Sequence, residues 1–394
     1  MNVLTISREY GAGGGELARH LASALGWDLL DQELLHRAAA VEQMPDAEWE
    51  RLDEKPVGLA DRLRLHPPAQ RYIHGITEAA RQAAARGRVI LVGRGTRHLV
   101  GDMADALHLR LIAPLAWRAQ RMARLQGWSV AEAEARCREI DRSRERFTRY
   151  FFGPQALQPE QYDLVVNTGR VLLEDVANWL RALIQHDKPP TDRPTTGRRI
   201  ITLTWQHKSL ESDLSAELAA RLGLRRIDPS ELDRQLEAAG IPSADVARLE
   251  EPAAGWWRRF RHRQLRRRYV EVVGRLVREW AQNQDVLLVS PDAHSLLRDH
   301  PRAHHARLVA PWLVRVRRVM AERWWKQGPA EQFLLDRDQR CERFCQSCFG
   351  SAWSDPLNYH LTVNAARLGK ATTDVLVWAA DRQWRRQEET SDGR

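Results

Sequence analysis

Short apolar runs alternate with helix-like segments along the first half of the chain. Val3–Ser7 and Val89–Val92 are almost wholly apolar, as strands buried on both faces are. Glu16–Leu25 places Ala and Leu at helical spacing and ends before Gly26, a residue that commonly closes helices. The pattern predicts an α/β fold, with a parallel sheet flanked by helices and ligands at the carboxyl ends of the strands.

The remaining elements of this half follow from the same periodicities. Further strands are expected at Trp27–Asp31, Ala106–Ile112 and Leu164–Asn167. Further helices are expected at Gln32–Val41, at Thr77–Arg86, from about Pro114, at Ala131–Thr148 and at Leu172–Ile184.

The pattern then recurs at a constant offset of 197 residues. VLTIS (3–7) aligns with IITLT (200–204), YDLVVNTGR (162–170) aligns with YHLTVNAAR (359–367), and four blocks between them keep the same register. A shared register over so many blocks indicates a tandem duplication.

The duplication sets the domain boundaries. HDKPPTDRPTTGR, at residues 186–198, is rich in Pro, Thr and charge, as exposed linkers are. We therefore expect one α/β domain at 1–185, a linker at 186–198, a second domain at 199–385 and a polar C-terminal tail at 386–394.

Composition narrows the class of protein. The chain of 394 residues has a net charge of +9, which favours anionic partners such as nucleotides, nucleic acid or acidic surfaces. It has four cysteines and no apolar run approaching 18 residues, and no signal peptide precedes the first strand. A cytoplasmic protein with reduced thiols and no membrane segment is expected.

The stretch REYGAGGGELA (8–18) lies between the first strand and the first helix. Backbone N–H groups of such turns hold phosphates, usually with a lysine and a Ser/Thr that binds Mg²⁺. Here Gly14 and Gly15 stand at those two positions, and Arg8 stands where the first glycine is usual. The alternative is a glycine turn that only permits tight packing.

The ordered blocks of the first half resemble the cytidylate kinase-like family, a branch of the P-loop nucleoside monophosphate kinases. The blocks are ISREYGAGGGELA (6–18), LLDQELLHRAA (29–39), VILVGRG (89–95), LIAPLAWRAQRM (111–122), DRSRERFTRYFFG (141–153) and YDLVVNTGR (162–170). The resemblance implies two P-loop NTPase-like domains, each with a helical lid. It also implies transfer of the ATP γ-phosphoryl group, with Mg²⁺, to a nucleoside monophosphate, with CMP as the candidate acceptor. The family looks similar in lacking the loop lysine.

The resemblance also implies which residues act. The donor phosphates would be held by the loop residues Arg8, Gly11, Ala12, Gly13, Gly14, Gly15 and Glu16. The acceptor nucleotide would be held by Asp31, Arg37 and Arg94, although Asp31 could equally cap a helix. The charge of the transferred group would be met by Arg118, Arg142 and Arg144, and no residue is assigned as a metal ligand.

The second half has lost most of these residues. KSLES (208–212) replaces GAGGG (11–15), Pro291 replaces Arg94 and Cys341 replaces Arg144. The second domain is therefore expected to be a pseudokinase-like partner that pairs with the first domain within the chain. The competing hypothesis is that the first domain binds nucleotide without turnover and the protein regulates or binds a partner.

Two other features of the second half are weighed separately. Cys341, Cys345 and Cys348 align with helix positions of the first half, which argues against a metal site. WWRRFRHRQLRRR (256–268) could bind nucleic acid or an acidic partner. A solvated helix face, or a cover over the neighbouring domain, is the interpretation favoured from sequence.

Overall fold

The structure is a computed structural model that describes residues 1–31, 67–189, 197–209, 213–251 and 256–392. The chain divides into two compact units, Met1–Asp187 and Lys188–Arg394. The division falls within the expected linker, of which residues 190–196 lie outside the described residues. Each unit is described below by itself.

Unit 1 contains a five-stranded parallel sheet with the order β2-β3-β1-β4-β5. Its strands are β1 (Val3–Arg8), β2 (Asp28–Asp31), β3 (Val89–Val92), β4 (Ala106–Ile112) and β5 (Leu164–Asn167). Its helices are α1 (Gly14–Leu25), α5 (Pro67–Arg86), α6 (Thr96–Val100), α7 (Leu115–Gln126), α8 (Val130–Phe152) and α9 (Leu173–Gln185), with a 3-10 turn η1 (Pro159–Gln161).

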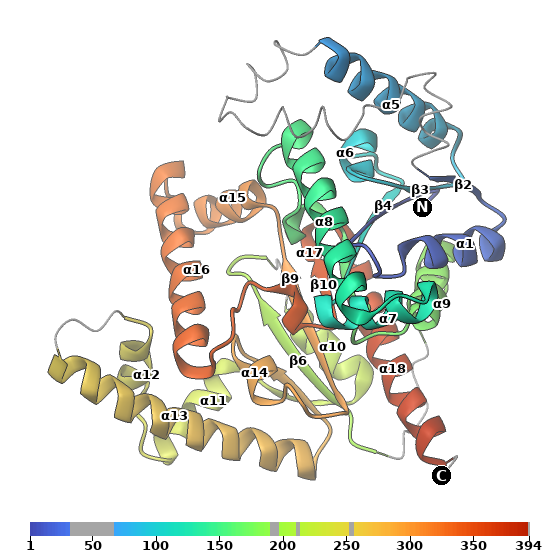
Figure 1. The fold of residues 1–394 in the computed structure, drawn as a ribbon. Coiled ribbons are helices and arrows are strands. Elements are labelled where there is room, and N and C mark those ends of the chain that lie inside the picture. Colours follow the sequence, from blue (N-terminus) through green and yellow to red (C-terminus); the bar gives the residue numbers. More distant parts are fainter. Residues whose placement is uncertain (32–66, 190–196, 210–212, 252–255, 393–394) are drawn as a thin grey trace. The chain divides into compact units, whose positions relative to one another are not determined.

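Both faces of this sheet are covered, as the apolar strands require. Val3, Val89 and Leu91 pack in one core with Tyr72 and Ile76 of α5. Because successive strand residues point to opposite faces, their neighbours in the strands face α1, which packs on β1 and β3 and against α9 (Figure 1). The α/β prediction is therefore confirmed.

Unit 2 repeats the architecture with the strand order β7-β8-β6-β9-β10. Its strands are β6 (Ile200–Trp205), β7 (Arg225–Ile227), β8 (Val286–Val289), β9 (Ala303–Val309) and β10 (Leu361–Asn364). Its helices are α10 (Leu214–Leu222), α11 (Pro229–Ala238), α12 (Ser243–Leu249), α13 (Trp256–Asn283), α14 (Ala293–Leu296), α15 (Trp312–Arg323), α16 (Gln327–Phe349), α17 (Ala365–Leu368) and α18 (Ala371–Asp392), with a 3-10 turn η2 (Pro356–Asn358).

The expected elements match the structure with three exceptions. The helix expected at Gln32–Val41 lies outside the described residues. Helix α5 begins ten residues earlier than expected, at Pro67. The residues expected as a tail from 386 continue helix α18 to Asp392, where Arg302 contacts Glu388 at 3.4 Å and Gln387 donates to the Pro301 carbonyl.

The two units share a buried polar brace at the 197-residue offset. Thr5 contacts Nδ1 of His108 at 2.8 Å, and Thr202 contacts Nδ1 of His305 at the same distance. These side chains are fully buried, and each bond joins the central strand of its unit to the next strand. The repeat therefore preserves interior polar contacts as well as apolar positions.

Unit 2 adds a second buried histidine beside this brace. His304 is 1% exposed, contacts Gln383 Oε1 through Nδ1 at 2.8 Å, and lies with its ring 4.9 Å from that of His360. Burial lowers the pKa of His304 from about 6.5 to about 4. The corresponding residue of unit 1 is Leu107, which is equally buried.

We expect His304 to make the protein acid-labile. Below pH 6.5 His304 is protonated in the unfolded chain but stays neutral in the folded protein. The free energy of unfolding therefore falls by about 1.4 kcal/mol per pH unit between pH 6.5 and 4. His304→Leu, which copies unit 1, should flatten the pH dependence of the thermal unfolding midpoint in this range. The exposed His20→Gln is the control, and equal slopes for wild type and His304→Leu would contradict the assignment.

Candidate active site

The glycine-rich turn joins β1 to α1 and leaves the start of the helix open. Gly11 and Gly13 have φ angles of +81° and +88°, which L side chains rarely adopt. Gly13 is the N-cap of α1 and offers no side-chain acceptor to the first turn. Since the first N–H groups of a helix have no intrahelical acceptor, this end of α1 can receive an anion.

The space available for a side chain differs among the last three glycines of the turn. A Cβ on Gly13 would lie 2.3 Å from Leu173 Cδ1, and one on Gly14 would lie 2.8 Å from Arg8 Cγ. A Cβ on Gly15 would meet only the Arg19 guanidinium, at 3.9 Å. Tight packing therefore explains Gly13 and Gly14, whereas Gly15 borders open space.

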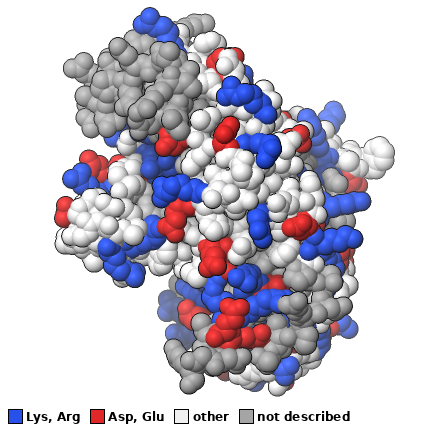
Figure 2. All heavy atoms as spheres, turned by 90° about the vertical axis from the view of Figure 1, so that its right-hand side faces the viewer, with Lys and Arg blue, Asp and Glu red and all other residues white. Residues whose placement is uncertain are grey.

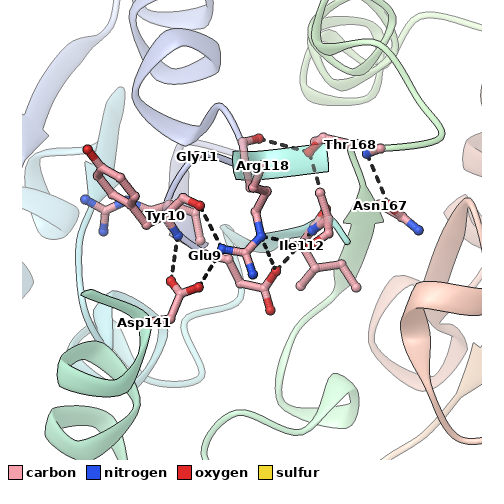
Figure 3. Close-up of polar contacts among 12 residues, drawn as sticks. Glu9, Tyr10, Gly11, Ile112, Arg118, Asp141, Asn167 and Thr168 are labelled. Carbon is pink, nitrogen blue, oxygen red and sulfur yellow. Dashed lines mark hydrogen bonds and ion pairs between the residues drawn. The ribbon is translucent and has the colours of Figure 1, made fainter. Parts of the chain in front are cut away.

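A buried guanidinium fixes the conformation of the turn (Figure 3). Arg118, on α7, is 6% exposed and donates from Nη1 to the Tyr10 carbonyl at 2.9 Å and to Asp141 at 2.5 Å. Asp141, on α8, also accepts from the Tyr10 N–H at 2.7 Å. Arg118 Nε donates to the Ala113 carbonyl at 2.8 Å. These contacts hold the turn, the end of β4 and helix α8 together.

Glu9 completes this arrangement from the end of β1. Its carboxylate accepts from the Ala113 N–H at 3.1 Å and lies 3.3 Å from Arg118 Nε. Burial raises the pKa of Glu9, and the positive charge of Arg118 opposes that shift.

Three arginines from distant parts of the chain converge beyond the carboxyl ends of the strands. Arg8 follows from β1, Arg94 comes after β3, and Arg144 comes from α8; all three line one cavity of about 220 Å³. Among the described residues, no carboxylate forms an ion pair with any of them. Burial, and then repulsion from Arg144 and Arg94, lowers the pKa of Arg8 to about 9. The cavity thus holds three guanidinium groups without an ion-pair partner, together with the carboxylates Glu9, Asp141 and Glu145 in its lining.

Aromatic rings hold two of these guanidinium groups without neutralising them. Arg94 lies over the Phe147 ring at 5.4 Å, and Arg144 lies over the Tyr10 ring at 5.6 Å. Arg144 also donates to the Arg8 carbonyl at 3.1 Å. The charges are therefore positioned in advance of any ligand.

A second cavity, of about 540 Å³, opens along the glycine-rich turn. Its lining includes every glycine of the turn, Glu16, Arg19 and Arg121, with Glu16 and Arg121 paired at 2.5 Å. Arg8, Glu9 and Arg144 line this cavity and the first one alike. The two cavities consequently share two cations and one carboxylate in their linings.

The structure places the predicted site residues unevenly. The loop residues line the second cavity apart from the buried Ala12, whose carbonyl accepts from Thr168. Arg118 and Arg142 line neither cavity, since Arg118 is committed to the turn and Arg142 is exposed. Asp31 ends β2 outside both cavities, and Arg37 lies outside the described residues.

Sequence reasoning assigned no role to three residues that line the first cavity: Glu9, Arg110 and Glu145. It placed Asp141 in the lid segment, and it interpreted Tyr162 as structural or at most near the adenine; both line this cavity. Arg110 lies over the Tyr162 ring at 5.5 Å. An arginine inside the apolar strand LHLRLI is a signal that could have identified it, because a charge inside such a strand needs a partner.

The same place in unit 2 is built differently. Trp205, Pro291 and Cys341 occupy the positions of Arg8, Arg94 and Arg144. Helix α10 begins at Leu214, and the carboxylate of its N-cap, Asp213, accepts from the Ala216 N–H at 3.1 Å. Burial raises the pKa of the Cys341 thiol to about 11, so the sulfur carries no charge at neutral pH.

Two general features of the described residues complete the picture. Within them, no helix is long and apolar enough to cross a membrane. Nor do three His, Cys, Asp or Glu side chains come together there as a group that could hold a metal ion.

Comparison with known proteins finds cytidylate kinases and one isomerase among the similar proteins. Cytidylate kinase from Methanothrix thermoacetophila is 31% identical over 169 residues, which cover 43% of this chain and 89% of that protein. Cytidylate kinase from Pyrococcus horikoshii is 29% identical over 191 residues, covering 48% and 92%. Uronate isomerase from Corynebacterium glutamicum is 33% identical over 89 residues, but the match spans only 17% of that relative's length.

A family model, described as the cytidylate kinase-like family, matches residues 3–170 and again residues 200–367. Both ends of the two matches lie 197 residues apart, which confirms the tandem duplication. The chain belongs to the cytidylate kinase-like family, with two family segments in tandem.

Proposed function

We propose that unit 1 transfers the γ-phosphoryl group of ATP to a nucleoside monophosphate, with CMP as the first candidate, and that unit 2 is non-catalytic. The observation that carries this proposal is the sharing of Arg8, Glu9 and Arg144 between two adjacent cavities. Phosphoryl transfer needs a donor and an acceptor placed in line, with cations where their phosphates meet.

The second cavity suits the phosphates of ATP. The N-terminus of α1 at Gly13 and Gly14, the open space beside Gly15 and the cation Arg19 line this cavity, where helix N–H groups would hold phosphate oxygens. ATP with Mg²⁺ supplies the transferable phosphoryl group and part of the neutralising charge. Glu9 offers the carboxylate at the junction, since Mg²⁺ is commonly held by one or two carboxylates and the phosphates themselves.

The first cavity suits the acceptor. Arg94 stands at the carboxyl end of β3, where its planar guanidinium can bind a phosphate through two N–H groups. The same lining includes Arg110, Glu145 and Tyr162, which would offer donors, acceptors and a ring to a base.

Catalysis in this site would rest on positioning and charge. Arg8 and Arg144 would hold the oxygens of the transferring group from two sides, which replaces the lysine that the loop lacks. Arg118 would act as a positioning residue, because it holds Tyr10 and Asp141 without reaching either cavity.

The non-catalytic role of unit 2 is supported by charge. Its counterpart of the three-arginine cluster contains Trp205, Pro291 and Cys341, which provide no cation. The protein's own carboxylate, Asp213, occupies the helix end that could receive a phosphate, and Arg226 pairs with it at 2.5 Å. A bound anion would have to displace this internal one.

The direct test of the proposal is ADP release from ATP and Mg²⁺ in the presence of each common nucleoside monophosphate. We expect turnover that depends on one or a few acceptors, with CMP among them. ATP binding without stimulation by any monophosphate would reject the enzyme and favour a nucleotide-binding regulator.

Arg144→Gln should lower kcat by about a hundredfold or more, because a cation that contacts the developing charge contributes about 3 kcal/mol or more. Arg142→Gln, two residues away on the same helix and outside both cavities, should keep activity within about twofold. Steady-state kinetics of the full chain would compare them. Substantial residual turnover in Arg144→Gln would place catalysis elsewhere, including in unit 2.

The glycines give a second matched pair. In Gly14→Ala the added Cβ would lie 2.8 Å from the Arg8 side chain, and we expect kcat/KM to fall about tenfold or more. In Gly15→Ala nothing lies nearer to the added Cβ than 3.9 Å, so this variant should fold and unfold as wild type does. Thermal unfolding together with kinetics measures both. Full activity in Gly14→Ala would show that the position of Arg8 is not critical.

A further inference from the structure

Helix α13 carries the most concentrated positive charge of unit 2. Its N-terminal half contains five consecutive or near-consecutive arginines whose side chains the structure describes: Arg261, Arg263, Arg266, Arg267 and Arg268. Four of them are exposed, and Arg266 is partly buried. The sequence alone favoured a solvated face here, which usually has carboxylates interspersed among its cations.

Among the described residues, no carboxylate is in ion-pair contact with these five arginines, although Asp245 and Glu251 line a cavity beside Arg261 and Arg268. Arg268 donates a hydrogen bond to the Ala239 carbonyl at 3.3 Å. On the molecular face shown in Figure 2, by contrast, Lys and Arg are intermixed with Asp and Glu. The arginines in this half of α13 therefore have no ion pair among the described residues, whereas cations on a surface helix are usually paired with carboxylates.

The other face of the same helix is already used. Leu265, Tyr269, Val272 and Val273 pack in the core of unit 2 with strands β6 and β8. A helix that lies on a membrane needs a free apolar face, and between residues 260 and 273, where the side chains are described, these apolar residues of α13 are taken up by the core. The exposed side of residues 260–268 carries positive charge. Phe260, which is 48% exposed, places an apolar ring beside these arginines.

A hollow beside the helix gives this surface depth. A cavity of about 760 Å³ lies between α12 and α13, lined by Arg248, Arg261, His262, Gln264, Leu265 and Arg268, together with Asp245 and Glu251. Asp245 is paired with Arg248 at 2.6 Å, and in the described part of the chain no ion pair joins Glu251 to Arg261 or Arg268. Cations beside a polar hollow and an exposed ring match what a flexible polyanion with planar groups requires.

We propose that this surface, residues 260–268 of α13, binds single-stranded nucleic acid. The arginines contact successive phosphates, and the Phe260 ring stacks on a base. This binding is separate from the nucleotide cavities of unit 1 and does not depend on phosphoryl transfer.

The test uses fluorescence anisotropy of the full chain with a labelled 20-nucleotide single-stranded RNA, titrated at several salt concentrations. Arg263→Gln with Arg267→Gln should weaken binding about tenfold or more and lower the salt slope by about 1.4, at about 0.7 per lost phosphate contact. Arg275→Gln with Arg278→Gln is the matched control, because it removes two exposed charges from the same helix next to Glu271 and Glu279. We expect the control to change affinity by less than twofold.

Further arms separate the alternatives. Phe260→Ala should weaken RNA binding about fivefold or more and leave the salt slope unchanged, while Arg94→Ala in unit 1 should have no effect. Equal losses in both double variants would show a general charge effect and overturn the proposal. So would undetectable RNA binding at 50 mM salt, or equally tight binding of polyglutamate or of anionic vesicles. If the first double variant unfolds, Arg267→Gln alone must lower the slope by about 0.7.

Discussion

The buried ion pair between Arg118 and Asp141 is the contact on which the N-terminal site depends. Together with their hydrogen bonds to Tyr10 and Ala113, these two side chains join the glycine-rich turn, the end of β4 and helix α8, which carry residues that line both cavities. Unit 2 retains the pair: Arg315 contacts Asp338 at 2.7 and 2.8 Å and donates to the His207 carbonyl. Losing one partner of such a pair leaves an uncompensated buried charge, which costs about 3–5 kcal/mol.

That constraint separates the framework from the chemistry. Both units keep the Arg–Asp ion pair, the buried Thr–His contact and the strand order, all of which belong to the interior of each unit. The positions of Arg8, Arg94 and Arg144 line a cavity in unit 1 and differ between the two units, while the strand order is the same in both. In unit 2 they now hold Trp205, Pro291 and Cys341, and the helix end is satisfied by Asp213. The same fold therefore occurs with the three-arginine cluster in unit 1 and without it in unit 2.

Uncompensated positive charge occurs in two physically different places. In unit 1, Arg8 and Arg144 are largely buried, and burial lowers the pKa of both, so the cluster is costly until an anion neutralises it. Along α13 the arginines are exposed to water, where the cost is small and the attraction for a polyanion is long-ranged and salt-dependent. The first arrangement suits a small, specifically held phosphate, and the second suits a flexible chain of phosphates.

The sequence by itself determined the strands of unit 1, the duplication and the glycine-rich turn, because these depend on local periodicity and on a repeat that any alignment of the halves reveals. It was less accurate for the helices, since α5 begins ten residues before the expected start and α18 continues through the expected tail. It also identified Arg94 and Arg144. It could not show that Arg118 is enclosed by Tyr10, Ala113 and Asp141, or that Arg142 faces away from both cavities, since those outcomes depend on which residues far apart in the chain approach one another. Only the tertiary structure decided which arginines stay unpaired, because a charge is compensated by its neighbours in space.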